Sequence, residues 1–271
     1  MGRPTLHCPC ERRFDAPAFS YDAPPAGETK FDFGERPYRR AYLRCALCAH
    51  WYSETDMPMS ALYSGAYVDG TYGERMRETF QRILALPSEE SDNAGRVARV
   101  LGFAREWFPA GKAPTLLDVG SGLGVFPFRM KEAGWRCTAL DPDPRAARHA
   151  REVAGVEAAT GDFLAIAPGG LGRFDVVTFN KVLEHVADPV AMLARAEKHL
   201  NEGGFVYLEV PDGEAAAAEG PAREEFFIEH HHVFSPTSVA LMAARAGFSP
   251  VAIERLREPS TKFTLRAFLF R

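Results

Sequence analysis

The chain has 271 residues, which is enough to bury one large core and a small accessory domain. Apolar residues make up 46% of the sequence and charged residues 25%, an ordinary balance for a globular protein in water. The formal net charge of −4 gives no electrostatic basis for nucleic acid or an anionic membrane as a partner. No stretch approaches the ~20 apolar residues that cross a bilayer. No apolar leader follows Met1, so we expect a cytoplasmic protein.

Residues 1–70 differ in composition from the remainder of the chain. They are rich in proline, arginine and aromatic residues and lack a long helical period. Only residues 38–44 are expected to form a strand there, leading into Cys45. We therefore expect a small, irregular N-terminal module over residues 1–70 that cannot support a core by itself. The main domain is expected to cover residues 71–271.

From residue 114 the sequence alternates between segments of strand and helix character. Short apolar runs predict strands at 115–119, 136–140, 174–179 and 204–210, with a weaker one at 156–159. Periodic segments predict helices at about 73–86, 92–108, 123–133, 143–153, 188–200 and 236–246. The last segment, 248–270, alternates well enough for an antiparallel hairpin. This order predicts an α/β fold with a doubly wound, mostly parallel seven-stranded, Rossmann-like sheet and helices on both of its faces.

The most informative motif is a glycine-rich turn between the first of these strands and the next helix. Gly120, Gly122 and Gly124 stand at alternate positions after an apolar run, as expected where backbone approaches a nucleotide-like ligand closely. A dinucleotide fingerprint has a third glycine where this chain has Val125. A carboxylate at Asp118 would repel a pyrophosphate but attract an ammonium group. The turn therefore favours S-adenosylmethionine (SAM), which carries an ammonium and no phosphate, over a dinucleotide.

Further polar residues follow the other predicted strands. Because ligands lie across the carboxyl ends of the strands in such a sheet, these residues are candidates for binding the same cofactor. Asp141 is placed to accept hydrogen bonds from both ribose hydroxyls. Asp162 is placed to accept from an adenine amino group while Phe163 packs on the ring. Asn180 is placed to meet the amino-acid end of the cofactor. Any one of them alone could be a helix cap or a turn residue.

Together these strings resemble class I SAM-dependent methyltransferases that act on small molecules. The resemblance runs from about 116 to 248 and includes the glycine turn and the stretches FDVVTF, VLEHV and LNEGG at 174–179, 182–186 and 200–204. It implies that Asp141 holds the ribose and that Asp162 contacts adenine. It also implies a small-molecule substrate.

Four of the five cysteines cluster early in the sequence. The spacing Cys45-x-x-Cys48 is that of a zinc knuckle, and Cys8-x-Cys10 offers two further thiolates for a closed structural site. The one-residue gap in the first pair is tight, so His7 or His50 is an alternative ligand, and free buried cysteines without metal remain possible. A similar two-plus-two cysteine module precedes some bacterial methyltransferases, including sugar C-methyltransferases. There a tyrosine-rich segment follows it, as Tyr63, Tyr67 and Tyr72 do here, and these three are candidates for a lid.

The candidate catalytic residues form two acid–imidazole pairs. Glu229-His230, with Phe-Ser four residues later, resembles a segment of sugar C-methyltransferases in which the pair flanks the substrate. That match makes His230 the general base and Glu229 its orienting or substrate-binding partner. Glu184-His185 is the second pair, and His185 is expected to lie near the sulfonium. The alternative interpretation is structural, with the histidines packing a loop onto the sheet.

These residues lead to a functional hypothesis and two alternatives. We expect a SAM-dependent methyltransferase acting on a small molecule, such as a nucleotide sugar or a secondary metabolite. One alternative is a SAM-binding regulatory or partner protein without its own catalysis, and the other is a nucleotide-dependent oxidoreductase. The sequence leaves open the acceptor atom (carbon, oxygen or nitrogen) and the oligomeric state.

Overall fold

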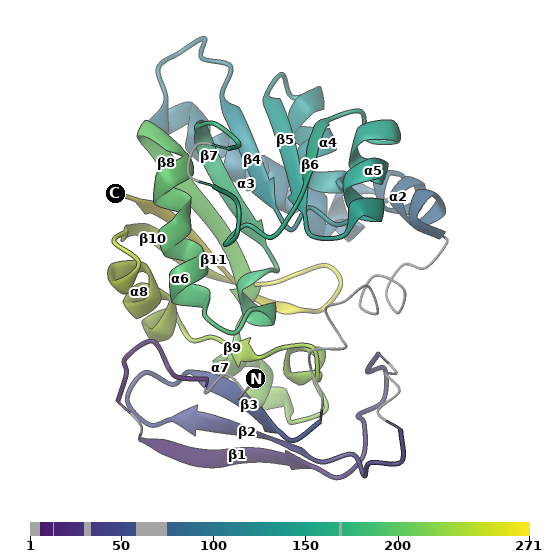
Figure 1. Cartoon of the computed structure of the whole chain (residues 1–271), viewed down its shortest axis with the longest axis vertical. Helices are drawn as coiled ribbons and strands as arrows, with labels where there is room; N and C mark the ends of the chain where they lie inside the picture. Colours follow the sequence, from purple (N-terminus) through teal and green to yellow (C-terminus); the bar gives the residue numbers. More distant parts are fainter. Residues whose placement is uncertain (1–5, 13, 30–33, 58–74, 168–169) are drawn as a thin grey trace.

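The computed structural model describes residues 6–12, 14–29, 34–57, 75–167 and 170–271 (Figure 1). Its larger sheet has seven strands in the order β10-β11-β8-β7-β4-β5-β6. The five strands from β6 to β8 pair in parallel, and β11 pairs antiparallel with both β8 and β10. This topology confirms the predicted α/β fold and the closing hairpin. The strand bounds are β4 Thr115–Val119, β5 Arg136–Asp141, β6 Glu157–Thr160, β7 Phe174–Asn180, β8 Leu200–Pro211, β10 Ser249–Arg257 and β11 Phe263–Phe270.

Helices cover both faces of this sheet. Adjacent strand residues point to opposite faces, so Leu116 joins one buried cluster and Leu117 the other. The first cluster packs against α2, α3, α4 and α5, and the second packs against α6 and α8. The predicted helix 188–200 is shorter than expected, because α6 gives way to a 3₁₀ turn, η6, before β8 begins. The helix bounds are α2 Met76–Leu84, α3 Asp92–Trp107, α4 Val125–Glu132, α5 Pro144–Glu152, α6 Pro189–Arg195, η6 Ala196–His199 and α8 Pro236–Arg245.

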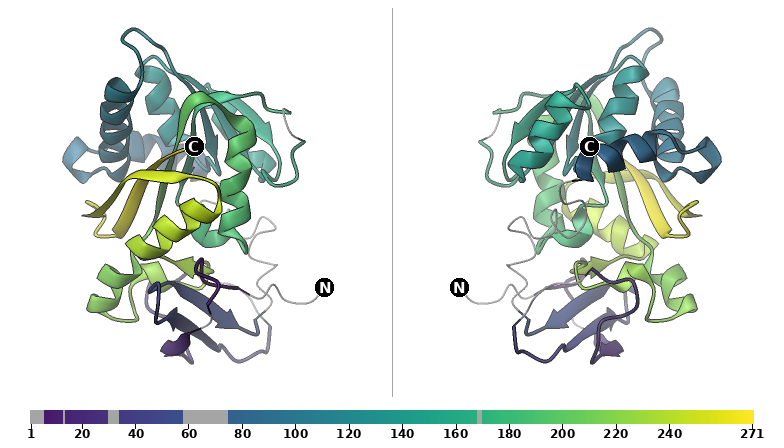
Figure 2. Two further views of the ribbon diagram at one scale, coloured as in Figure 1. Left: turned by 90° about the vertical axis from the view of Figure 1, so that its left-hand side faces the viewer. Right: turned by 90° about the vertical axis from the view of Figure 1, so that its right-hand side faces the viewer.

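The N-terminal module is a regular sheet, so the expectation of an irregular module is wrong. Three strands, β1 (Asp15–Tyr21), β2 (Arg40–Cys45) and β3 (Trp51–Thr55), pair antiparallel. A two-residue strand from the main domain, β9 (His232–Val233), pairs with β3 and completes the sheet. Figures 1 and 2 show this smaller sheet at one end of the molecule, beside α7 and β9. The sequence missed β1 because it lacks clear alternation, and β3 and β9 because they have only five and two residues.

The core of this module is shared with the main domain. Tyr42 and Trp51 from the module pack with Ala216, Phe226 and Val233 from the main domain. Helix α7 (Gly213–Glu219), which the sequence did not predict, begins against the indole of Trp51. A Cβ atom at Gly213 would lie 2.5 Å from that ring, so glycine is required for this close approach. The module therefore packs its buried aromatic residues against the main domain.

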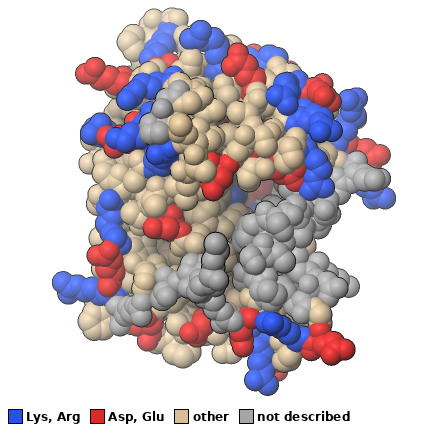
Figure 3. All heavy atoms as spheres, viewed as in Figure 1, with Lys and Arg blue, Asp and Glu red and all other residues tan. Residues whose placement is uncertain are grey.

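The helices and the charged surface bear on the possible partners of the chain. Within the described part of the chain, no helix is both long and apolar enough to cross a membrane. On the face drawn in Figure 3, basic and acidic side chains are interspersed. Neither observation identifies a partner.

Candidate active site

The glycine turn connects β4 to α4 as expected. Gly120, Gly122 and Gly124 have φ angles of +69°, +53° and +72°, all in the left-handed region that favours glycine. A Cβ atom at Gly120 would lie 2.6 Å from Cγ2 of Val182, so a side chain there would displace the segment after β7. Gly124 is the N-cap of α4. The turn is braced from within, since the N–H groups of Gly120 and Ser121 donate to the Leu140 carbonyl and that of Gly124 donates to the Ser121 carbonyl.

Asp118 is buried at the end of β4 and is held by residues of β7. Its Oδ1 accepts hydrogen bonds from Thr178 Oγ1 at 2.6 Å and from Asn180 Nδ2 at 2.8 Å. Burial raises the pKa of Asp118 to about 6, although both of these hydrogen bonds oppose the shift. Asn180 Oδ1 is buried and has no hydrogen-bond partner among the described residues. A carboxylate and an orphaned carbonyl oxygen side by side are suited to a cationic amino group.

Asp141 at the end of β5 braces the glycine turn. Its Oδ2 accepts from the Gly122 N–H and its Oδ1 from the Asp143 N–H, each at 2.9 Å. Burial raises the pKa of this carboxyl group. Each oxygen keeps a second lone pair, so the carboxylate has capacity for two further donors. The structure therefore brings the turn, Asp118, Asp141 and Asn180 together at one edge of the sheet.

The two residues predicted after β6 have different positions. Asp162 is exposed, and its Oδ1 accepts from the Leu164 N–H at 2.9 Å. The preceding Gly161 N–H donates to the Asp141 carbonyl, so this loop adjoins the β5 end. Phe163 is buried, with its ring 5.8 Å from that of Phe179 and 5.2 Å from that of His199. Its ring belongs to the core of the sheet, which argues against the predicted packing on adenine.

Two histidines from distant parts of the chain, His185 and His230, lie close to each other. His185 Nδ1 donates to the Glu229 carbonyl at 2.9 Å, and His230 Nδ1 donates to the Glu225 carbonyl at 2.8 Å. The ring centroids are 4.9 Å apart. Because a carbonyl only accepts, each Nδ1 carries the proton and each neutral ring has its lone pair on Nε2. Burial lowers the pKa of His185 to about 4 and, with the nearby His185, lowers that of His230 well below its usual value.

One buried carboxyl group lies beside these imidazoles. Glu184 lies in the 3₁₀ turn η5 (Leu183–His185) that follows β7, and its buried Oε2 has no hydrogen-bond partner among the described residues. One ligand atom from each of Glu184, His185 and His230 lies within 4.8 Å of the others. Burial raises the pKa of Glu184 to about 7 and that of Glu229 also to about 7. Neutral imidazoles beside the Glu184 carboxyl group, whose pKa is near neutral, form a cluster suited to proton transfer. The sequence singled out both pairs but did not predict their contact.

A buried charge network beneath this cluster was not predicted. Arg96 Nε donates to Glu209 Oε2 at 2.8 Å, and the Tyr207 hydroxyl donates to Glu209 Oε1 at 2.5 Å. Lys181 follows β7 with a left-handed φ of +59°, and its N–H donates to the Glu209 carbonyl. Burial lowers the Lys181 pKa, although Glu209 and Glu184 oppose the shift. The sequence does contain one sign of this network, because Glu209 is an acidic residue within the otherwise apolar run 205–210.

The four early cysteines converge. Their Sγ atoms all lie within 4.8 Å of one another, with Cys8 and Cys10 at 3.2 Å and Cys10 and Cys45 at 3.6 Å. The described cysteines form no disulfide. Burial raises the pKa of the Cys45 thiol, but the N–H groups of Cys48 and Leu47 and the other thiols outweigh it and lower the pKa to about 7. Four gathered thiols with backbone N–H groups directed at sulfur fit a tetrahedral metal site.

The alternative ligand His50 is not part of this cluster. Its Nδ1 lies 3.2 Å from Ser238 Oγ and its Nε2 lies 3.0 Å from His232 Nδ1. Both ring nitrogens are therefore used elsewhere, and the suggestion that His50 replaces a thiolate is wrong. His7 is exposed and is not in the cluster either. Tyr63, Tyr67, Tyr72 and the boundary predicted at residue 70 lie outside the described residues.

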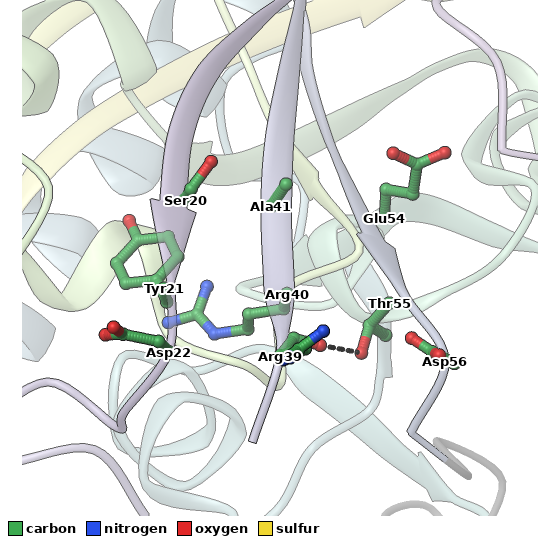
Figure 4. Close-up of a pocket in the computed structure, with 9 residues that line it drawn as sticks. All are labelled: Ser20, Tyr21, Asp22, Arg39, Arg40, Ala41, Glu54, Thr55 and Asp56. Atoms are coloured by element: carbon green, nitrogen blue, oxygen red, sulfur yellow. Dashed lines mark hydrogen bonds between the residues drawn. The ribbon is translucent and has the colours of Figure 1, made fainter. Parts of the chain in front are cut away.

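A separate cleft of about 750 Å³ opens on the N-terminal module (Figure 4). Its guanidinium groups come from Arg39 and Arg40, and its carboxylates from Asp22, Glu54 and Asp56. The mixture of charges gives it no preference for an anion or a cation. Arg40 is already paired with Glu28 and stacks 3.8 Å from the Tyr21 ring centroid. The cleft therefore lacks the features of a catalytic site.

The fold and the site define a class of protein, and a family comparison agrees. Residues 72–253, more than half of the chain, match the model of a methyltransferase domain family. The chain therefore belongs to this family. The match and the fold confirm the class predicted from the sequence, the class I SAM-dependent methyltransferases.

Individual relatives cover different parts of the chain. A 1,6-didemethyltoxoflavin-N1-methyltransferase from Burkholderia thailandensis is 21% identical, with a TM-score of 0.54 over 81% of this chain and 94% of that one. Magnesium protoporphyrin IX methyltransferase from Synechocystis is 14% identical, with a TM-score of 0.57 over 79% and 97%. At these identities the likeness shows the fold.

Relatives in sequence are more similar over shorter stretches. A ubiquinone biosynthesis O-methyltransferase from Caulobacter vibrioides is 38% identical over 110 residues, which are 36% of this chain and 43% of that protein. A cypemycin N-terminal methyltransferase from Streptomyces is 34% identical over 117 residues, 40% of this chain and 47% of that protein. The chain thus spans less than half the length of these curated relatives.

Proposed function

We propose that this chain is a SAM-dependent methyltransferase that modifies a small molecule, with His230 as the general base. The observation that carries the proposal is the fixed tautomer of His230. Its Nδ1 proton is bound to the Glu225 carbonyl, so the Nε2 lone pair is available beside Glu184 and His185. Glu184 and His185 lie in the turn directly after β7, whose last residue, Asn180, binds Asp118. The proposed base and the proposed cofactor site therefore share one strand end.

The residues present fit the cofactor. Asp118 and Asn180 would hold the ammonium group, because a buried carboxylate and an unpaired amide oxygen need a donor there. The carboxylate of Asp141 would take the ribose hydroxyls, Asp162 would contact adenine, and the turn at 120–124 would allow close backbone approach. When bound, SAM supplies an electrophilic methyl group on a sulfonium.

The chain's own contribution to the reaction would be alignment and proton removal. Methyl transfer is an in-line displacement, so holding the acceptor in position supplies most of the rate enhancement. His230 is neutral at pH 7 because its pKa is lowered by burial, and it would take the acceptor proton on Nε2. Its neighbour His185 is also neutral at pH 7, because burial lowers its pKa to about 4. Glu229, with a pKa of about 7, would orient the substrate by hydrogen bonding.

Nucleotide sugars and secondary metabolites are the substrate classes we propose. The support is the Glu229-His230 pair followed by Phe234-Ser235, which resembles sugar C-methyltransferases. The names of the relatives include O- and N-methyltransferases, so the fold accommodates several acceptor atoms. The acceptor proton in each case would leave through His230.

We also propose a structural zinc ion bound by Cys8, Cys10, Cys45 and Cys48. Four thiolates close a tetrahedral site and leave no position for substrate, so the metal would stabilise the module rather than take part in catalysis. Such thiols stay reduced in the cytoplasm, which is the location we propose for the protein.

The test is a panel of nucleotide sugars and small aglycones, read out as S-adenosylhomocysteine release. SAM binding is measured by calorimetry on the same preparation. We expect release with at least one acceptor, and loss of release in Glu229→Ala with His230→Ala while SAM still binds. SAM binding without release for any acceptor would indicate a binding protein instead. Binding of NAD but not SAM would contradict the cofactor assignment.

A further inference from the structure

The N-terminal module holds the main chain that carries the proposed base. We call residues 227–235 the base loop. The hydroxyl of Tyr42, a fully buried residue on β2, lies 2.7 Å from the His230 carbonyl and 3.1 Å from the Phe227 carbonyl. The single phenol proton lies between these two carbonyls, and the shorter distance favours donation to the carbonyl of His230, the residue that bears the proposed base.

Two more module residues bind the same loop. Glu28 Oε2 accepts from the Ile228 N–H at 2.8 Å and is fixed by a buried ion pair with Arg40 at 2.7 Å. The Ser53 N–H on β3 donates to the His231 carbonyl at 2.9 Å. From the other side, the His231 N–H donates to the Glu184 carbonyl at 2.7 Å. The loop is therefore clamped between the module and the turn after β7.

Two buried histidines, His50 of the module and His232 of the base loop, are joined by a hydrogen bond. His232 Nε2 lies 3.2 Å from the Ala187 carbonyl, which only accepts, so Nε2 carries the His232 proton. His232 Nδ1 then accepts from His50 Nε2 at 3.0 Å, and His50 Nδ1 accepts from the Ser238 hydroxyl. Both histidines are 0% exposed, so water cannot substitute for either partner. His50 thereby fixes the tautomer and the position of the residue two places after the base.

The cysteine knuckle in turn fixes His50. The Cys45 N–H donates to the His50 carbonyl at 2.8 Å, and the Ala49 N–H donates to the Cys45 carbonyl at 2.9 Å. The Cys48 carbonyl accepts from Ser235 Oγ at 2.5 Å, at the end of the base loop. The four cysteines, His50 and the base loop thus form one continuous hydrogen-bonded unit.

We propose that Tyr42 and His50 are positioning residues for His230, through which the cysteine module sets the geometry of the base. This inference rests on the proposed function. Neither side chain has a role in holding the cofactor, and both act on the loop through hydrogen bonds to its backbone or to His232. A displacement of about 1 Å at a reacting group costs on the order of 100-fold in rate, so such contacts matter for kcat.

Three substitutions test whether Tyr42 and His50 position the base or only stabilise the fold. Tyr42→Phe removes only the hydroxyl, and we expect kcat to fall about tenfold with unchanged affinity for SAM. His50→Phe keeps the ring volume but leaves His232 Nδ1 buried without a donor, and we expect kcat to fall about 10- to 100-fold. His50→Gln restores a donor at the position of Nε2 and should recover most of kcat.

The matched control is His199→Phe. His199 is also 0% exposed, and its Nδ1 donates to the carbonyl of Gly172, in the segment before β7 rather than in the base loop. The His199→Phe substitution should lower the melting temperature without lowering kcat per folded molecule. If His50→Phe behaves like His199→Phe, losing stability but keeping kcat, the positioning role is wrong. Equal losses of kcat in the Gln and Phe variants at His50 would also contradict it.

A readout that does not need activity distinguishes the failure of this inference from that of the proposed function. Histidine side-chain ¹⁵N NMR should show His232 as the neutral Nε2–H tautomer in the native protein, and as a mixture in His50→Phe. A protein that methylates nothing but shows this change keeps the clamp and loses the proposed function. A native His232 that is not the Nε2–H tautomer overturns the hydrogen bond from His50 to His232 and with it the positioning role of His50.

Discussion

The cofactor edge of the large sheet and the N-terminal module are built in opposite ways. The cofactor edge is formed by neighbouring strands, and Asp118, Asp141 and Asn180 each lie at the carboxyl end of the strand that places them. The module has buried residues of its own in Tyr42 and Trp51, but three of the five buried residues of its core come from the main domain. The first region is held by hydrogen bonds between neighbouring strands of one sheet. The second region depends on packing against the main domain.

Because of this difference, we expect SAM binding and methyl transfer to depend on different regions of the molecule. Among the described residues, the hydrogen bonds of the proposed cofactor site run between β4, β5, β7 and their turns and involve none from the module. The proposed base lies on a loop whose backbone is bound by Tyr42, Glu28 and Ser53 of the module. Damage to the module should therefore impair methyl transfer before it impairs SAM binding. The predictions below test this separation, from the largest expected effect to the smallest.

The largest effect is expected from the cysteine cluster. Cys45→Ser with Cys48→Ser should abolish metal binding and lower the free energy of unfolding by several kcal/mol, because structural zinc contributes about 10–16 kcal/mol in small zinc-dependent domains. Metal content by mass spectrometry and thermal unfolding measure this. Cys137→Ser is the control, since Cys137 is buried in the main domain away from the cluster. One zinc per chain is expected in the native protein and in the control, and a native protein without metal would contradict the prediction.

Next in size is the loss of the proposed base. His230→Gln should lower kcat about 10²- to 10⁴-fold, the usual contribution of a general base. The dissociation constant for SAM should stay unchanged, because His230 lies outside the cofactor edge. Steady-state kinetics and calorimetry on one preparation give both quantities. An unchanged kcat would remove His230 from the reaction.

The third prediction concerns the cofactor edge alone. Asp141→Asn removes the charge that two backbone N–H groups bind, each at 2.9 Å. Hydrogen bonds to a charged group contribute about 1.5–3 kcal/mol, so SAM affinity should fall about 10- to 100-fold. Zinc content and the signals of the base loop should not change. A loss of zinc in this variant would mean that the two regions are not separable.

The smallest effect is a pH dependence of cofactor capture. The pKa of Asp118 is raised to about 6, so below pH 6 this carboxyl group is protonated in the free chain and attracts an ammonium group poorly. We expect kcat/KM for SAM to fall about tenfold per pH unit below pH 6. At saturating SAM, kcat should persist to lower pH, because the pKa of His230 is lowered and that of His185 is about 4. In the Asp118→Asn variant, the decrease in kcat/KM for SAM near pH 6 should disappear.

The sequence predicted the strands and turns of this edge well because their signals are local. A short apolar run ending in a carboxylate, followed by glycines, already implies a strand, a turn and a helix. The same local logic located Asp118, Asp141 and Asn180 at strand ends. It failed for Phe163, because a phenylalanine after a strand gives no sign of which side its ring takes. Only the packing of Phe179 and His199 shows that the ring is in the core.

The base loop was predicted only in part because its partners are remote. The spacing within 229–235 indicated a functional segment, but nothing near it pointed to Tyr42 or His50, which lie about 190 residues earlier. His50 was instead interpreted as a possible metal ligand because of its place beside the knuckle. A two-residue strand such as β9 has too few residues for any period to show, so the sheet that joins the two regions could not be predicted.

Hydrogen–deuterium exchange of the base loop tests the central claim most directly. The comparison is between the native chain and Cys45→Ser with Cys48→Ser, with peptides covering 227–232 and 115–126 followed in the same run. If the module clamps the base loop, exchange at 227–232 rises in the variant while the glycine turn at 115–126 keeps its native protection. Unchanged protection at 227–232, or equal loss of protection in both segments, would contradict the account.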